Sequence, residues 1–98
     1  MTIKQVKSDL REIQYYYAHE QEFVGATKII GKSSILDKLE KYNAAICKAS
    51  TQLYYLYLSL YVHFNTQIVA AMDMDLSVGY IKRLNKDLYI FFQNELGE

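Results

Sequence analysis

The chain contains no proline or tryptophan, a single cysteine and four glycines among its 98 residues. Proline breaks helix interiors and glycine weakens them, so their scarcity favours a helical architecture. With Cys47 alone, no internal disulfide is possible, and a reducing compartment is the simpler interpretation. We therefore expect a soluble, cytoplasmic protein.

Net charge and long apolar runs are also lacking. Eleven basic residues balance eleven acidic ones, so the chain as a whole does not attract nucleic acid, and DNA binding would need local clusters of charge. Eight of the eleven basic residues lie in 28–48 and 82–86, on either side of the acids Asp73 and Asp75. The longest apolar run, Leu53–Phe64, is shorter than the about 20 residues of a membrane span, and the first residues form no signal core. We expect no membrane partner.

Apolar spacing in the first quarter of the chain predicts a helix within residues 1–24. A chain of 98 residues has room for one domain and one core. Thr2 and Gln5 are placed to form a capping box at the start of this helix. Its seam advances in steps of three and four residues, with one polar position: Ile3, Val6, Leu10, Ile13, Tyr17, Glu20 and Val24.

The same spacing resumes in residues 34–64, after a linker at 25–33, which predicts an all-α fold that begins with a helical hairpin. Ser34 and Asp37 are available to cap the start. The segment forms one long helix or breaks near Ser50 and Thr51, because both residues also cap helices; the sequence leaves both open. The second seam consists of Leu39, Tyr42, Ile46, Ala49, Leu53, Leu56, Leu60 and His63.

Tyrosines are more numerous than two helical seams can bury, so some must face outward or meet a partner. Tyr54, Tyr57 and Tyr61 form a second stripe beside the leucine seam, which predicts a central helix covered on several sides. Tyrosine is common at interfaces because its ring adds apolar area and its hydroxyl still bonds water. We expect a homodimer. The other tyrosines of these two regions are Tyr15, Tyr16, Tyr17 and Tyr55.

Residues 65–98 have the pattern of two helices joined by a tight turn. Asn65 or Thr66 would cap a helix at 67–74, and Ser77 would cap a second at 78–96. Ala71 supplies the small residue that a helix-turn-helix needs where its helices cross. The remaining apolar positions of such a motif are filled by Ala70, Met74, Leu76, Ile81 and Leu84.

The stretch TQIVAAMDMDLSVGYIKRLNKDL, residues 66–88, resembles the helix-turn-helix of sigma-factor region 4. It is also similar to the ends of small phage transcription regulators of the ArpU and RinA kind. LYLSLYVHF and VKSDLREIQYYYAHEQEF resemble the helices that precede the motif in those proteins. The resemblance implies a phage- or bacterial-type transcriptional regulator that binds double-stranded DNA through its final helix.

The resemblance also implies which residues would touch DNA. Those expected to be exposed toward the groove are Ser77, Val78, Gly79, Lys82, Arg83 and Lys86, and those expected near phosphates are Thr66 and Gln67. Two positions depart from the pattern. Asp75 stands where the turn usually has glycine, and Gly79 lies inside the second helix, where glycine costs about 1 kcal/mol relative to alanine.

No pattern in the chain predicts catalysis, a cofactor or a metal site. GATKIIGKSS resembles a phosphate-binding loop, but five residues separate Gly25 from Gly31 instead of four and no apolar strand precedes them, so a linker with solvated Lys28 and Lys32 fits better. His19 and His63 lack partners at metal-ligand spacing, and we expect His63 to be partly buried. Cys47 lacks a nearby histidine and is expected to be a small helix residue.

Three functions remain after these exclusions. The first is the DNA-binding regulator described above. The second is a helical protein-interaction module that binds a host or phage protein, such as a polymerase, a repressor or a defence factor, without affinity for DNA; the zero net charge and the acids beside the turn favour it. The third is a structural assembly protein, which would form an oligomer larger than a dimer.

Overall fold

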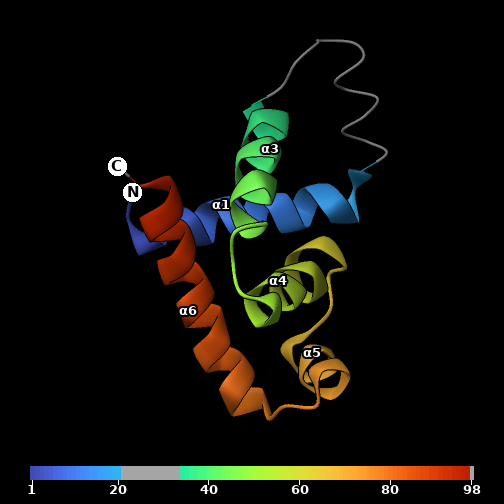
Figure 1. Cartoon of the computed structure of the whole chain (residues 1–98). Helices are drawn as coiled ribbons and strands as arrows, with labels where there is room; N and C mark the ends of the chain where they lie inside the picture. The colour runs from blue at the N-terminus through green and yellow to red at the C-terminus, as the bar shows by residue number, and fades with distance from the viewer. Residues whose placement is uncertain (21–33, 98) are drawn as a thin grey trace.

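The computed structural model describes residues 1–20 and 34–97, and this part of the chain contains helices and no strand. The all-α fold class is therefore confirmed. The elements are α1 (Ile3–Ala18), α3 (Ser34–Ile46), α4 (Thr51–Tyr57), the π-helix η1 (Leu58–Val62), α5 (Gln67–Met74) and α6 (Val78–Leu96). Figure 1 shows their arrangement.

Helix α1 begins with the predicted capping box. The Thr2 hydroxyl accepts a hydrogen bond from the Gln5 amide (3.1 Å), and the Gln5 side chain accepts one from the Thr2 amide (2.7 Å). The buried face differs from the predicted seam at its end, where Tyr16 is buried, Tyr17 is half-buried and Glu20 is exposed. Residues 21–24 of the predicted helix and the linker 25–33 lie outside the described residues. The other buried residues of α1 are Val6, Leu10 and Ile13.

Residues 34–64, which could form one long helix or break near Ser50 and Thr51, form two helical segments. Helix α3 ends at Ile46, and Ser50 caps α4 by accepting a hydrogen bond from the Leu53 amide (3.3 Å). Cys47, expected inside a helix, lies in the turn between them. The predicted seam survives on both sides of the break in the buried residues Leu39, Tyr42, Ile46, Leu56 and Leu60, whereas Ala49 and Leu53 beside the break are half-buried.

The end of the second segment winds as a π-helix, which the sequence did not predict. The His63 amide donates to the Leu58 carbonyl five residues earlier (2.8 Å), and Phe64 then adopts a left-handed backbone with φ of 58°. The expectation that His63 is partly buried was wrong, because its side chain is exposed. The predicted seam assumed α-helical pitch throughout, and the wider π-turn shifts the phase of the residues that follow it.

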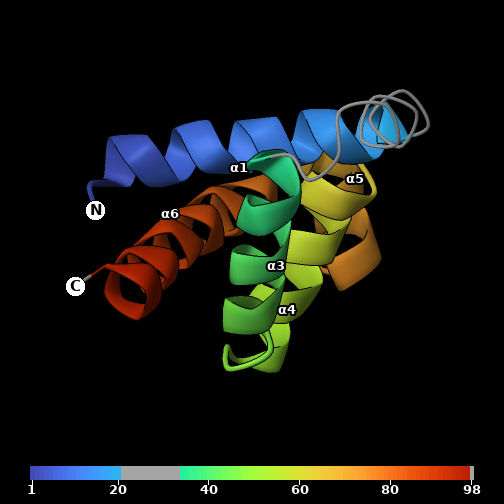
Figure 2. The same ribbon diagram turned by 90° about the horizontal axis from the view of Figure 1, so that it is seen from above.

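Helix α4 and η1 occupy the centre of the molecule and contact α1, α3, α5 and α6. Helix α1 lies across the other helices, as Figure 2 shows, and it crosses α3 steeply instead of running antiparallel along it as in a simple hairpin. The core is rich in rings: Phe92 of α6 lies 4.8 Å from Tyr42 and 5.7 Å from Tyr57, measured between ring centroids. Four tyrosines are buried in the core, namely Tyr16, Tyr42, Tyr57 and Tyr61.

The first and last helices of the described chain meet. The Gln93 side chain donates a hydrogen bond to the Met1 carbonyl (3.2 Å), and Figure 1 shows the start of α1 beside the end of α6. Helix α1 therefore joins the core through contacts with the most distant part of the sequence.

Candidate nucleic-acid interface

Helices α5 and α6 begin and end at the predicted residues, and side-chain caps explain both starts. The Thr66 hydroxyl accepts a hydrogen bond from the Val69 amide (3.2 Å), and the Ser77 hydroxyl accepts one from the Tyr80 amide (3.1 Å). Each cap satisfies an amide that has no partner within its helix. The two helices are thereby fixed to start at Gln67 and Val78.

The turn between them is built on a left-handed aspartate. Asp75 has φ of 56° and ψ of 46°, and its amide and that of Leu76 donate to the carbonyls of Met72 (3.3 Å) and Ala71 (2.9 Å). This pair of bonds is the Schellman arrangement, which usually places glycine in the left-handed position. Ala71 is buried and α5 contacts α6, and the tight turn that the sequence indicated between the two helices is present.

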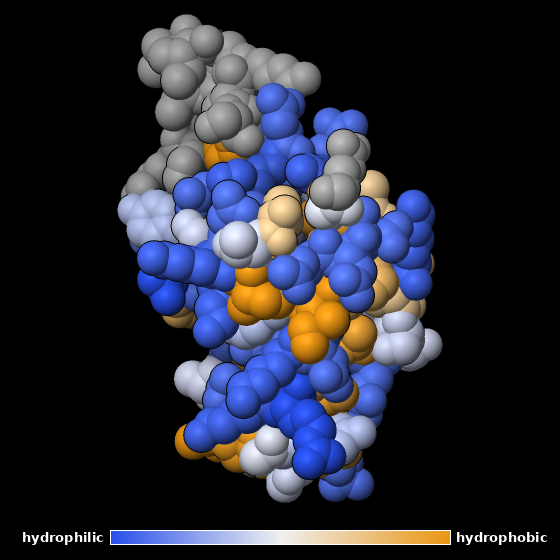
Figure 3. Space-filling model, turned by 90° about the vertical axis from the view of Figure 1, so that its left-hand side faces the viewer, coloured by the Kyte–Doolittle hydropathy of each residue, from blue (hydrophilic) through white to orange (hydrophobic). Residues whose placement is uncertain are grey.

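The three cations of α6 lie on its exposed side. Lys82, Arg83 and Lys86 fall within little more than one turn, opposite the buried residues of the same helix. Within the described residues none of the three forms an ion pair with an acid. Figure 3 looks onto the side of the molecule where α6 lies in Figure 1 and shows a mostly hydrophilic surface with smaller apolar patches.

Gly79 is exposed one turn before these cations, and no contact within the described chain requires it to be glycine. A Cβ added at this position would have no heavy atom within 4 Å. Glycine costs about 1 kcal/mol relative to alanine in a helix interior, but Gly79 is the second residue of α6 and lies in its first turn. A frayed first turn and a close approach of DNA are both compatible with glycine at this position.

The remaining predicted site residues are more scattered. Ser77 is exposed but its hydroxyl caps α6, and Val78, expected to be exposed, is half-buried against the core. Exposed Thr66 and half-buried Gln67 lie at the far end of α5, about 12 Å along the helix from the turn. Only Gly79, Lys82, Arg83 and Lys86 form a compact exposed group.

A second set of cations lies on α1 and was not singled out from the sequence. Lys4, Lys7 and Arg11 are exposed at a spacing of three and four residues, which places them on one side of the helix. The acids of α1 lie on its other side, where Asp9 and Glu12 bind Lys38 of α3 at 3.1 Å and 2.7 Å. The helical spacing places the cations and the acids on different sides of α1, which the net charge of the whole chain does not report.

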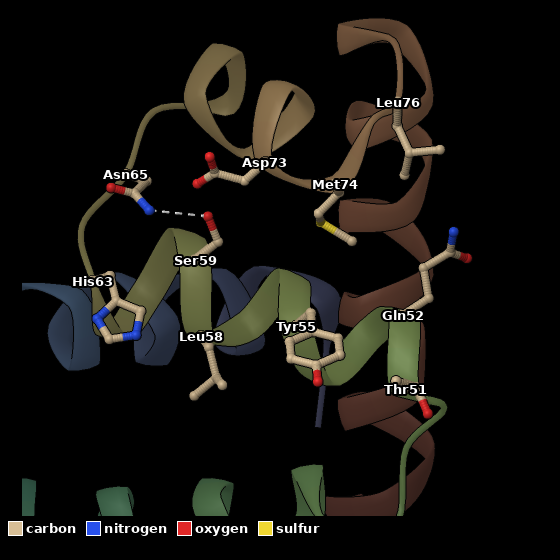
Figure 4. Close-up of a pocket in the computed structure, with 10 residues that line it drawn as sticks. All are labelled: Thr51, Gln52, Tyr55, Leu58, Ser59, His63, Asn65, Asp73, Met74 and Leu76. Carbon is tan, nitrogen blue, oxygen red and sulfur yellow. Dashed lines mark hydrogen bonds between the residues drawn. The ribbon is translucent and has the colours of Figure 1, made fainter.

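A hollow of about 680 Å³ lies between α4 with η1 and the α5–α6 turn (Figure 4). Ser59 is nearly buried there, and its hydroxyl accepts a hydrogen bond from the Asn65 side chain (3.2 Å). In Figure 4 the Asp73 carboxylate lies on the same side as Asn65 and Ser59. The hollow is lined by Thr51, Gln52, Tyr55, Leu58, Ser59, His63, Asn65, Asp73, Met74 and Leu76.

Searches of residues 1–20 and 34–97 for two further kinds of feature gave no candidate. No three side chains among His, Cys, Asp and Glu gather where they could hold a metal ion. No helix in these ranges has both the length and the apolar character needed to cross a membrane.

Comparisons of the chain with protein-family models, with curated proteins and with solved structures gave no match.

Proposed function

We propose that this protein is a small DNA-binding regulator of phage or bacterial type that contacts double-stranded DNA through the exposed side of α6. The observation that carries the proposal is the group of Lys82, Arg83 and Lys86, exposed together without an acidic partner in the described chain, next to a turn of the kind that joins the helices of a helix-turn-helix. Unpaired cations on one helix face suit a polyanion.

The chemistry of the individual residues supports the same surface. A guanidinium such as that of Arg83 forms two parallel hydrogen bonds with the edge of a guanine, whereas the ammonium groups of Lys82 and Lys86 act on phosphates as point charges. Gly79, which no internal contact explains, would let the DNA backbone approach the start of α6 closely. The acids Asp73 and Asp75 reduce the attraction and limit binding to the part of α6 beyond the turn.

Fluorescence anisotropy with a labelled duplex of random sequence tests the proposal. The variant Lys82→Ala/Arg83→Ala should weaken binding and reduce the slope of log affinity against log salt by about 1, because Lys82 contacts a phosphate and each phosphate contact contributes about 0.9 to that slope. The matched control is Lys41→Glu, which lowers the net charge by the same two units at an exposed lysine that forms no ion pair within the described residues. Equal affinity for the wild type and the α6 variant would contradict the proposal.

A second candidate function, protein binding, is favoured by the outer side of α5. Ile68, Val69 and Met72 are 62%, 39% and 75% exposed on this short helix, and Phe64 before it is 57% exposed. An exposed apolar strip of this kind is typical of a protein contact. We propose that it joins two copies of the chain, so that the dimer presents two α6 helices to DNA.

Light scattering measures the oligomeric state of the chain and so tests whether the strip joins two copies. Ile68→Glu/Met72→Glu should turn a wild-type dimer into a monomer, whereas Asn94→Glu, an exposed position on α6, should leave the dimer intact. A wild type that is monomeric at high concentration would assign the strip to a different protein, and an oligomer larger than a dimer would favour a structural assembly.

A further inference from the structure

A polar pocket of about 300 Å³ lies between α1, η1 and α6, outside the group of cations on which the proposed function rests. The Lys7 ammonium lies over the Tyr89 ring, 5.4 Å from its centroid. Arg11 and Gln14 follow Lys7 on the same side of α1, and Tyr61 of η1 forms the inner part of the pocket. Its lining comprises two cations, one amide and two phenols, with no carboxylate: Lys7, Arg11, Gln14, Tyr61 and Tyr89.

The hydrogen bonds behind the pocket hold one proton only weakly. The buried Tyr61 hydroxyl donates its single proton to the side-chain oxygen of Asn85 (2.6 Å), and the side-chain amide of Asn85 donates to the Tyr89 hydroxyl (2.8 Å). The remaining contact, between the Tyr61 and Tyr89 hydroxyls, is long (3.4 Å) and uses the Tyr89 proton. An acceptor that enters the pocket can take that proton instead.

Burial keeps the inner phenol neutral, and its contact with Tyr89 acts in the same direction. The pKa of Tyr61 is raised chiefly by burial and further by its hydrogen bond with Tyr89. Tyr61 thus remains a hydrogen-bond donor to Asn85, and the chain from Tyr61 through Asn85 to Tyr89 holds the outer hydroxyl in place.

The acids that could neutralise this pocket are engaged elsewhere. Asp9 and Glu12, the acids on α1 nearest in sequence to Arg11, both bind Lys38 of α3. Gln14 contributes no charge, and its amide donates to the Leu60 carbonyl at the wall of the pocket (3.0 Å). An ammonium, a guanidinium and a phenolic proton therefore converge on one space, an arrangement that suits a phosphate group.

We propose that this pocket binds a backbone phosphate of the DNA that α6 contacts, so that the nucleic acid lies across α6 and α1. Tyr89 makes the connection, because it lines the pocket and lies one helical turn from Lys86 and two from Lys82 on α6. The inference rests on the proposed function and adds Lys7, Arg11 and Tyr89 to its contact surface.

The first experiment measures the affinity of a duplex as a function of salt. Lys7→Ala/Arg11→Ala should weaken binding about tenfold, the scale of a charge-assisted hydrogen bond, and lower the salt slope by about 1. Tyr89→Phe keeps the ring beneath Lys7 and removes the hydroxyl, which is also the acceptor for the Asn85 side-chain amide, and it should weaken binding about threefold. Lys41→Glu again serves as the control for a change of charge alone.

The outcomes separate this inference from the proposed function. If Lys82→Ala/Arg83→Ala weakens duplex binding while Lys7→Ala/Arg11→Ala matches the control, the pocket does not contact DNA and only the inference fails. If the wild type does not bind a duplex at all, the proposed function fails and the inference with it.

A second experiment distinguishes DNA from free phosphate as the source of the anion. The ring resonances of Tyr89 are followed by NMR during titration with duplex and, separately, with inorganic phosphate at matched ionic strength. The shift should be complete at a lower phosphate concentration with duplex than with the free ion, and it should vanish in Lys7→Ala/Arg11→Ala. Saturation by inorganic phosphate at the lower concentration would overturn the assignment to DNA.

Discussion

The two sides of α1 carry opposite charges and differ in what those charges contact. On one side, Asp9 and Glu12 bind Lys38, and Asp9 also accepts a hydrogen bond from the buried Tyr42 hydroxyl (2.7 Å). On the other side, Lys7 and Arg11 meet a tyrosine ring and an open pocket but no acid in the described chain. One side is used in holding the fold together, and the cations of the other side form no ion pair within the described residues.

This difference shows why a net charge of zero says little about the local charge of a surface. Charges that are paired within the fold contribute little to the attraction of a ligand. Unpaired charges of one sign on one side of a helix contribute most of it. The contrast between the two sides of α1 can be tested directly. Substitutions on the paired side should lower stability, and substitutions on the unpaired side should lower duplex affinity.

The largest expected effect is alkaline unfolding, which should act on the paired side. The pKa of Tyr42 is raised by burial and then by its bond to Asp9, and the pKa of Lys38 is raised chiefly by its hydrogen bond with Glu12. Both groups therefore favour their protonated forms in the fold, so stability is complete below about pH 10 and is lost as pH rises above it. The part of the tyrosinate absorbance that comes from the buried tyrosines should appear together with loss of helical circular dichroism.

The control for this prediction is Tyr42→Phe, which removes the titrating hydroxyl and retains the ring. Its free energy of unfolding should fall less steeply between neutral and alkaline pH than that of the wild type. Tyrosinate forming fully while the helices remain intact would show that the buried hydroxyls do not resist ionisation.

Asp9→Ala should cost about 1–3 kcal/mol of unfolding free energy, because it leaves the Tyr42 hydroxyl without its oxygen acceptor inside the core. Asp9→Asn retains an oxygen acceptor and should cost less. Urea denaturation gives both values. Duplex affinity should be unchanged in each variant, and a tenfold loss of affinity in Asp9→Asn would show that the two sides of α1 are not separate in function.

Asp75→Gly should raise stability by up to about 1 kcal/mol, because glycine adopts the left-handed conformation without the steric cost of a side chain. It should also tighten duplex binding a few-fold by removing an acid near the unpaired cations. Asp75→Asn removes the charge but keeps a side chain. Comparing the two variants by thermal unfolding and anisotropy assigns the stability gain to the backbone and the affinity gain to the charge.

The smallest expected effect is on the stability of Lys7→Ala/Arg11→Ala, which should lie within about 0.5 kcal/mol of the wild type, as for most exposed substitutions. Chemical denaturation measures it under the conditions of the binding experiment. A loss as large as that of Asp9→Ala would mean that these cations are structural and that the contrast between the two sides of α1 is wrong.

The sequence predicted best where local chemistry decides the structure. Thr66 and Ser77 cap helices through bonds to amides three residues away, and Asp75 tolerates the left-handed turn, so the bounds of α5 and α6 could be predicted without knowledge of the fold. The capping box at Thr2 and Gln5 was found for the same reason.

It predicted less where the outcome depends on distant packing. Ser50 could cap a helix or lie within one, and neither the π-helix nor the exposure of His63 had a local signal. The pocket depends on Lys7 lying over Tyr89, two residues far apart in the chain whose meeting follows only from the way α1 crosses α6. The spacing of the α1 cations was available in the sequence, but the partner helix was not.

The meeting of α1 and α6 also couples binding to folding. A phosphate held jointly by Arg11 and Tyr89 would link the first helix of the chain to the last one, so DNA would act as a non-covalent cross-link between α1 and α6. Occupancy at a hundred times the dissociation constant would add about 2.7 kcal/mol to the unfolding free energy. The protein would then be most stable when it is bound to DNA. Truncation within α6 would remove part of the core and part of the binding surface together.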